Sequence, residues 1–234
     1  MKTFFLLSVV ALLPVILSAL IYLAERTKAI RKLPYAVRQL LIGVLFGGLA
    51  ILGTEFGIKT DGAIINARDA SPICAGLLFG APAGIIAGLI GGVERWFAVL
   101  WGAGQYTRLA CSISTVLAGV FAAVLRKFMF DNKKPKWYYC LATATITEVI
   151  HMLMIFLTNM TDARTAFSFV RTCSLPMIAV NSLAVMLAGL LLSILSGADR
   201  KSERRDLKKI SQSFQRFLLI CVTAGFLMTT IFTW

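Results

Sequence analysis

Long apolar runs, separated by short polar and basic segments, make up most of the chain. They fall at about 4–24, 39–57, 63–79, 82–100, 107–126, 137–158, 169–196 and 217–234. Several of them exceed the ~18 apolar residues that mark a transmembrane helix candidate. Because backbone polar groups in lipid must find partners within the protein, these runs predict helices joined by short turns. The pattern predicts an all-α polytopic membrane protein with about seven or eight membrane segments.

A glycine recurs at every fourth position in the middle of the chain, at Gly76, Gly80, Gly84, Gly88 and Gly92. This spacing lets another helix backbone approach closely and is common in membrane helices, so we interpret the glycines as a packing motif. Pro82 interrupts the series and removes a backbone donor, which predicts a break at 80–84. The runs on either side can form one long helix or two short ones.

Basic residues gather in three clusters, at 26–38, 126–136 and 200–216. Clusters of this kind favour the cytoplasmic side of a membrane. If all three lie on that side, the stretch 63–100 must cross the membrane an even number of times. We therefore expect a short Gly/Pro-hinged helical hairpin there, with both of its ends at the outer face and with the N-terminus of the chain outside.

The expected segments divide the chain into four regions. A first membrane helix and basic loop cover 1–38, and the main membrane module covers 39–196. A basic cytoplasmic linker at 197–216 precedes an additional membrane helix at 217–234. We expect that last helix to lead to an output region.

Composition narrows the class of protein. The chain has 234 residues, of which 58% are hydrophobic, and this excludes an ordinary soluble domain. Its net charge of +13 can indicate nucleic acid binding, but in a membrane protein it is typical of basic cytoplasmic loops. We therefore expect membrane lipids around the protein and no nucleic acid partner. The expected location is a membrane that the chain crosses several times.

No pattern of metal binding or catalysis is present in the sequence. The five cysteines are odd in number and show no CxxC spacing, so neither a disulfide framework nor a metal site is expected. Phosphate-binding, zinc-protease and nucleophile-elbow motifs are also absent. We expect that this chain is not an enzyme and carries no cofactor.

Two arginines, Arg68 and Arg95, flank the glycine series. In one interpretation both guanidinium groups converge on a carboxylate, which arginine binds in a bidentate manner. In the other, each arginine pairs with its acidic neighbour, Asp69 or Glu94, or extends to the membrane surface. The residues alone leave both interpretations open.

A second candidate follows at the outer end of the run 107–126. Cys111, Ser114 and Thr115 are spaced so that they share one face of a helix, and Arg108 lies one turn earlier. A thiol and two hydroxyl groups can line a small polar pocket. They can equally serve helix packing, with the hydroxyl groups bonded locally.

Glu148 and His151 are one helical turn apart within the run 137–158. Such a pair inside a membrane can relay protons or respond to pH. A buried hydrogen bond between the two side chains, which fixes packing, is the interpretation that we favour.

The central part of the chain resembles the LytS/YhcK-type five-transmembrane receptor module. The resemblance covers about 40–195 and rests on Asn66-x-Arg68-Asp69, on the glycine series closed by Arg95, and on Ala110-Cys111-x-Ile113-Ser114-Thr115. It implies the membrane sensor of a bacterial signalling protein, including two-component kinases linked to pyruvate sensing or cell-wall turnover. It also implies a dimer and an S-component-like core, so a transporter's substrate-binding subunit is the alternative function.

The resemblance also implies a site for a small carboxylate such as pyruvate, built from Arg68, Arg95, Cys111 and Ser114. Asn66, Arg108 and Thr115 are expected to border it, because they belong to or adjoin the same motifs. Two features depart from the family pattern: a longer and more apolar link at 96–105, and an arginine at 108.

Overall fold

The computed structural model describes residues 2–60, 63–100, 102, 104–197, 215, 219 and 223. Nearly all of the expected linker at 197–216 and of the expected helix at 217–234 lies outside this range. Within the described residues the elements are α1 (Lys2–Ala24), α2 (Lys28–Arg31), α3 (Tyr35–Glu55), β1 (Ile58–Thr60), β2 (Ala63–Ile65), α4 (Ala70–Cys74), the π-helix η1 (Ala75–Phe79), α5 (Ala81–Phe97), η2 (Ala98–Leu100), α6 (Arg108–Val124), the π-helix η3 (Leu125–Met129), α7 (Trp137–Thr158), η4 (Met160–Asp162) and α8 (Ala163–Ser196).

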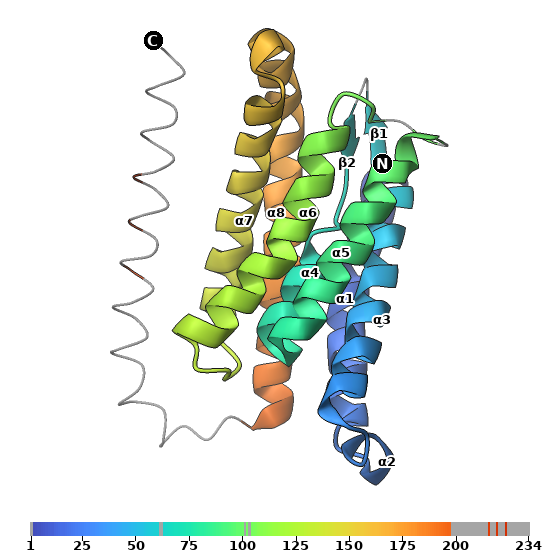
Figure 1. The fold of residues 1–234 in the computed structure, drawn as a ribbon, viewed down its shortest axis with the longest axis vertical. Coiled ribbons are helices and arrows are strands. Elements are labelled where there is room, and N and C mark those ends of the chain that lie inside the picture. The colour runs from blue at the N-terminus through green and yellow to red at the C-terminus, as the bar shows by residue number, and fades with distance from the viewer. Residues whose placement is uncertain are drawn as a thin grey trace.

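Long apolar helices form the body of the protein (Figure 1). In the described part of the chain, six are long and apolar enough to cross a membrane: Leu7–Ala24, Tyr35–Glu55, Ala81–Leu100, Arg108–Met129, Trp137–Thr158 and Met160–Ser196. Their outward faces carry large exposed apolar side chains, including Leu20, Leu89 and Leu183. Exposure of such apolar faces to water would be unfavourable, whereas lipid can cover them.

The basic loops lie together at one end of the bundle. Figure 1 shows α2, the turn between η3 and α7, and the end of α8 at the lower end. The start of α1, the two strands and the turn between α7 and α8 lie at the upper end. The first two basic clusters therefore share one end, as the charge pattern predicts, and the chain begins at the other.

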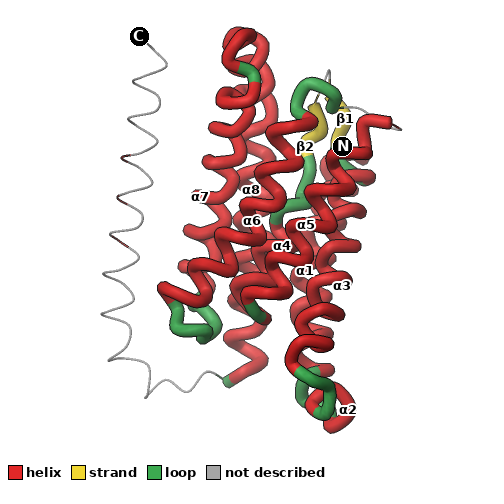
Figure 2. Tube along the Cα trace, in the orientation of Figure 1, coloured by secondary structure: helices red, strands yellow, loops and turns green. Residues whose placement is uncertain are grey.

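The run 63–79 is not a continuous helix, and the protein is not wholly α-helical. Its first residues form β2, which pairs antiparallel with β1, with Ile58 opposite Ile65. A segment outside helix and strand follows at 66–69, which we call the extended segment, although its last residue, Asp69, already has helical backbone angles. Only then does the chain enter α4 and η1 (Figure 2). The sequence Asp61-Gly62 between the strands is a favoured hairpin turn, and the neighbouring isoleucines favour strands. A prediction based on hydrophobicity alone uses neither the Asp-Gly sequence nor the preference of isoleucine for strands.

Gln39 of α3 holds the connection between η1 and α5. Its amide nitrogen donates to the Phe79 carbonyl at 3.3 Å, and its amide oxygen accepts from the Ala83 backbone nitrogen at 3.3 Å. A Cβ atom added at Gly80 would collide with this amide, so a larger residue there would displace the Gln39 side chain from its hydrogen bonds. Pro82 lies in the first turn of α5, where its missing N–H costs nothing.

The glycine series is a packing surface, as expected. A Cβ atom added to Gly84 would lie 2.5 Å from the Cα of Gly76, and one added to Gly92 would lie 2.8 Å from the Ser112 carbonyl oxygen. The small residues thus bring η1, α5 and α6 into backbone contact.

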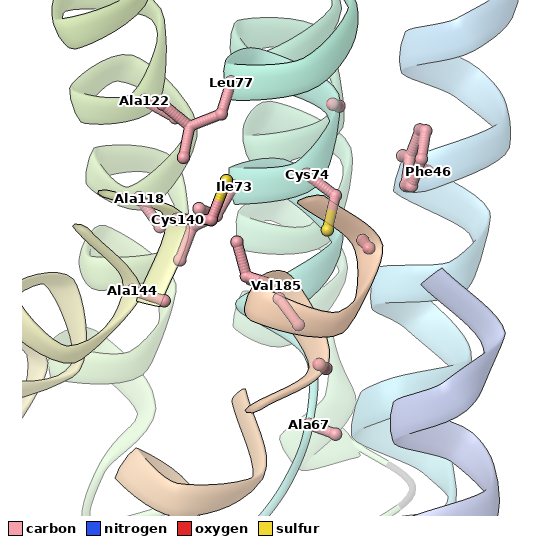
Figure 3. Close-up of a cluster of buried hydrophobic side chains, with 14 of the residues drawn as sticks. Phe46, Ala67, Ile73, Cys74, Leu77, Ala118, Ala122, Cys140, Ala144 and Val185 are labelled. Carbon is pink, nitrogen blue, oxygen red and sulfur yellow. The ribbon is translucent and has the colours of Figure 1, made fainter. Parts of the chain in front are cut away.

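The core is centred on α4 and η1, which the longer helices surround. Figure 3 shows Ile73 and Leu77 among side chains from α6, α7 and α8. These neighbours, all inaccessible to solvent, are Ala118, Ala122, Cys140, Ala144 and Val185. Close packing around this short helix fixes where the extended segment before it, 66–69, lies within the bundle.

Candidate functional site

The extended segment 66–69 carries polar groups into the middle of the bundle. Asn66 shapes it locally: its side-chain oxygen accepts from the Arg68 backbone nitrogen at 3.2 Å, and its side-chain nitrogen donates to the Ile64 carbonyl at 2.9 Å. Asn181 of α8 braces both flanks, because it donates to the Asn66 carbonyl at 3.1 Å and accepts from the Ala70 backbone nitrogen at 2.9 Å. Asn66 therefore positions the segment.

Arg68 is completely buried and is surrounded by acceptors. Its Nε donates to Thr115 Oγ1 at 2.7 Å and to Asp69 Oδ1 at 3.3 Å. The two terminal nitrogens make longer contacts, from Nη1 to Thr54 Oγ1 at 3.3 Å and from Nη2 to the Cys111 carbonyl at 3.4 Å. Pairing with the acidic neighbour, one of the two interpretations, thus holds for this arginine.

Asp69 connects three elements through its carboxylate. Oδ1 accepts from Thr115 Oγ1 at 2.7 Å in addition to Arg68, and Oδ2 lies 2.7 Å from Nδ1 of His151 on α7. Each carboxylate oxygen therefore has a polar partner, although the side chain is inaccessible to solvent. Such a satisfied network is what a buried carboxylate requires.

His151 bonds to Asp69 instead of Glu148, so the expected hydrogen bond within α7 is wrong. The Glu148 Oε2 atom lies 3.9 Å from His151 Nδ1, beyond hydrogen-bond distance, whereas Asp69 Oδ2, from the segment 66–69, lies at 2.7 Å. The other ring nitrogen of His151, Nε2, lies 3.3 Å from Cys111 Sγ. Glu148 is buried, and neither of its carboxylate oxygens has a hydrogen-bond partner among the described residues.

Arg95, near the end of α5, is also fully buried but is less well satisfied. Its Nη2 donates to the Gly104 carbonyl at 2.7 Å and to Thr107 Oγ1 at 3.3 Å. Its Nε and Nη1 have no hydrogen-bond partner within the described part of the protein. The side chain interacts electrostatically with Cys111 and Arg68, so the two arginines lie in one cluster.

Cys111, Ser114 and Thr115 are buried on α6, as their helical spacing predicts, but they do not all face the same neighbours. Thr115 bonds Arg68 and Asp69, and Cys111 contacts His151. Ser114 lines a cavity of about 230 Å³ between α6 and α7, together with His151. In the described structure the Ser114 hydroxyl has no hydrogen-bond partner.

Arg108 lies outside this cluster. Its Nε donates to the Trp96 carbonyl at 2.8 Å, and its guanidinium group lies 4.1 Å from the centre of the Trp96 ring. In this structure Arg108 thus contacts Trp96 and not the residues around Asp69, and its role at the ligand site stays a prediction. A carbonyl acceptor and an aromatic face at the end of α5 hold the side chain on the periphery.

Asp69 and His151 were not predicted as parts of this cluster, nor was Thr54. The motif Asn66-x-Arg68-Asp69 marked the segment, but the aspartate was interpreted only as a neighbour of the arginine. No local signal links residues 69 and 151, which are far apart in the sequence. The polar spacing of Thr147, Glu148 and His151 on one face of α7 is the signal that indicates a polar interior there.

Three of these side chains carry atoms that could together coordinate a metal cation. Ligand atoms of Asp69, Glu148 and His151 lie within 4.8 Å of one another, and all three residues are buried. His151 Nδ1 and Asp69 Oδ2 already share a 2.7 Å hydrogen bond, and the Arg68 charge lies beside the same carboxylate. Asp69 and His151 are thus satisfied by each other and by Arg68, whereas the Glu148 carboxylate has no hydrogen-bond partner among the described residues.

A bundle of apolar helices around buried cationic and thiol groups defines a polytopic membrane protein with an internal polar site. The chain matches, over residues 21–195, the family described as 5TMR of 5TMR-LYT, and it belongs to this family of five-transmembrane receptor modules. It is thus a multi-pass membrane module of the two-component sensor type.

Curated relatives carry the same module within longer proteins. The chain is 25% identical over 199 residues to the sensor histidine kinase YpdA of Escherichia coli, an alignment that covers 85% of this chain and 34% of YpdA. It is 27% identical to the sensor histidine kinase BtsS of Escherichia coli, over 64% of this chain and 26% of BtsS. The sensor protein LytS of Bacillus cereus is 29% identical, over 69% of this chain and 26% of LytS.

The chain spans about a third or less of the length of these relatives. No solved structure matches it.

Proposed function

We propose that this chain is the ligand-binding membrane module of a bacterial signalling receptor, and that its ligand is a small carboxylate of the pyruvate type. Arg95 carries the proposal: it is fully buried, yet two of its nitrogens have no hydrogen-bond partner among the described residues. Leaving buried donors unpaired is costly, and a guanidinium group offers paired donors that suit a carboxylate. A bound anion would remove that cost.

Arg68 would be the second contact. Its contacts through Nη1 and Nη2 are long, at 3.3 and 3.4 Å, so these nitrogens can turn toward a ligand at little cost. Its Nε stays fixed by Thr115. The Cys111 thiol and the unpartnered Ser114 hydroxyl would contact the opposite end of the ligand.

The charge distribution supports an orientation for the module. Basic loops at one end favour the cytoplasmic side, which leaves the start of α1 and the two strands outside. The limb formed by β2, α4 and η1, followed by α5, would then be the hairpin that returns the chain to the outer face. Arg95 is close to that face, so the ligand would enter from outside.

Signalling would follow from a shift in packing. A ligand changes a conformational equilibrium only by its differential affinity for the two states. Closing both arginines around one carboxylate would pull α5 and the 66–69 segment together against α6. The change would pass to an output domain, a kinase if the longer relatives are a guide, in a dimeric receptor of the inner membrane. The family match gives no support to the alternative of a transporter subunit.

Thermal unfolding of the purified protein with pyruvate and other small carboxylates tests the proposal. A ligand at about 100 times its Kd should stabilise the native state by about 2.7 kcal/mol. Arg95→Ala should abolish this stabilisation. Arg108→Ala is the matched control, because this arginine lies at the same end of the protein but outside the cluster. Equal ligand stabilisation in the Arg95 variant, or none in the unmodified protein, would contradict the site.

A further inference from the structure

Cys111, His151 and Asp69 form a continuous line of contacts across three elements. His151 Nε2 lies 3.3 Å from Cys111 Sγ on α6, and His151 Nδ1 lies 2.7 Å from Asp69 Oδ2 in the extended segment. When a carboxylate accepts the Nδ1 proton of a histidine, Nε2 is left as the basic nitrogen. The nitrogen facing the thiol is therefore the one able to remove its proton.

This order of groups is that of an activated nucleophile: a thiol, a base in contact with it, and an acidic group that orients the base. A buried network that served packing alone would need no such order. Two buried guanidinium groups also lie near the thiol, because Arg68 Nη2 contacts the Cys111 carbonyl at 3.4 Å and Arg95 interacts electrostatically with Cys111. Positive groups next to a cysteine favour the reactive thiolate form.

Two further observations bear on a ligand: Arg95 interacts electrostatically with Cys111, and Ser114 lies in the cavity between α6 and α7 with His151. The Nε and Nη1 groups of Arg95 and the hydroxyl of Ser114 are buried and without hydrogen-bond partners in the described structure. The Arg95 guanidinium group offers donors to an anion, and the Ser114 hydroxyl can donate a hydrogen bond to a neutral carbonyl oxygen. A molecule with a carboxylate at one end and a carbonyl at the other would satisfy both.

We propose that Cys111 is a nucleophile that adds reversibly to the carbonyl carbon of a bound 2-oxo acid, with His151 as its base. The inference rests on the proposed carboxylate site. It adds that the site recognises the electrophilic carbonyl of the ligand as well as its carboxylate. Carboxylates of the same size without that carbonyl would bind only through the arginines.

The step balances without any other reactant. The thiol proton moves to His151 Nε2, a bond forms between Cys111 Sγ and the carbonyl carbon, and the carbon–oxygen π bond breaks. The oxygen takes the proton back from the imidazolium, which gives a neutral hemithioketal. Nothing leaves and nothing is oxidised, so the reverse steps release the intact ligand. Asp69 orients His151 and stabilises its charged form throughout.

Carbon-13 NMR of the full chain in detergent, with pyruvate labelled at the keto carbon, tests the step directly. The signal of the bound ligand should move from the carbonyl region to that of a tetrahedral carbon. Cys111→Ala should abolish the tetrahedral signal while pyruvate still stabilises the protein through Arg95. Cys140→Ala is the matched control, because Cys140 is a buried free cysteine in the core and should leave the signal unchanged.

Two further comparisons separate the roles. Lactate, which lacks the carbonyl, should bind the unmodified protein at least ~10-fold more weakly than pyruvate, which corresponds to about 1.4 kcal/mol of binding free energy. The two ligands should bind Cys111→Ala with the same affinity. His151→Gln should retain stabilisation by both ligands but form the tetrahedral species more slowly. An unchanged rate in this variant would overturn the role of His151 as the base.

The outcomes distinguish this inference from the function on which it rests. Pyruvate binding with the signal still in the carbonyl region would overturn covalent addition and leave the carboxylate site standing. A tetrahedral signal that persists in Cys111→Ala would overturn the assignment to Cys111. No binding of any small carboxylate would overturn both proposals.

Discussion

Two fully buried arginines in this protein have different surroundings. Arg68 has hydrogen-bond acceptors from its own segment, α3 and α6, and it lies against the Asp69 carboxylate. Arg95 bonds only through Nη2, to Gly104 and Thr107, and leaves Nε and Nη1 without partners among the described residues. The difference separates a cation whose donors the protein itself pairs from one with unpaired donors. In the proposed site, Arg68 would lend the ligand only its weakly held Nη1 and Nη2 groups.

The largest expected effect comes from removing the structural cation. Arg68→Ala removes the positive charge beside the buried Asp69 carboxylate. It also removes the hydrogen bonds that Arg68 donates to Asp69, Thr115, Thr54 and the Cys111 carbonyl. Breaking a buried pair in this way should lower the free energy of unfolding by about 3–5 kcal/mol. Denaturant unfolding in detergent measures it. A loss similar to that caused by Arg95→Ala would contradict the distinction between the two arginines.

The next effect concerns ligand response rather than intrinsic stability. Arg95→Ala should remove the stabilisation of about 2.7 kcal/mol that a saturating carboxylate gives at 100 times its Kd. Thermal unfolding with and without pyruvate gives the value. Without ligand, the unfolding temperature of Arg95→Ala should be closer to that of the unmodified protein than the unfolding temperature of Arg68→Ala is.

A smaller effect tests the brace on the extended segment. Asn181→Ala leaves the Asn66 carbonyl and the Ala70 backbone nitrogen without their side-chain partner. Unsatisfied buried groups of this kind should cost about 1–3 kcal/mol. The expected sign is a lower unfolding temperature together with weaker pyruvate binding, since the segment also positions Arg68. Asn159→Ala is a suitable control, because its side chain bonds only within the end of α7.

The smallest effect is expected at the peripheral arginine. Arg108→Ala removes a contact with the Trp96 ring that is worth about 0.5–1 kcal/mol at an exposed site. The unfolding temperature should change slightly, and the pyruvate response should not change. If Arg108→Ala lost as much ligand stabilisation as Arg95→Ala, Arg108 would have to be counted among the ligand contacts.

Much of the architecture could be predicted from hydrophobic runs and charge. Six long helices coincide with expected apolar runs, and the basic loops gather at one end. The run 63–79 was the exception, because hydrophobicity does not distinguish a buried strand and extended segment from a helix. There the β-branched residues on either side of the sequence Asp61-Gly62 outweighed the apolar pattern.

The candidate site was predicted in part. The motif residues Arg68, Arg95, Cys111 and Thr115 do come together, which their positions in the motifs suggested. Arg108 does not join them, because helical spacing cannot foresee that Trp96 offers a nearer partner. Glu148 and His151 seemed a local pair, but a hydrogen bond from a distant segment replaced the local one.

By itself, the sequence determined that this is a helical membrane protein with basic loops on one side, and that arginines flank a glycine-rich packing surface. Those features follow from local composition and spacing. Only the tertiary structure decided that Asp69, His151 and Cys111 form one line of contacts, and that Arg68 is satisfied while Arg95 is not. The physical reason is that each partner comes from a different element. Their distances depend on how α4 packs among α6, α7 and α8, and local spacing carries no information about that packing.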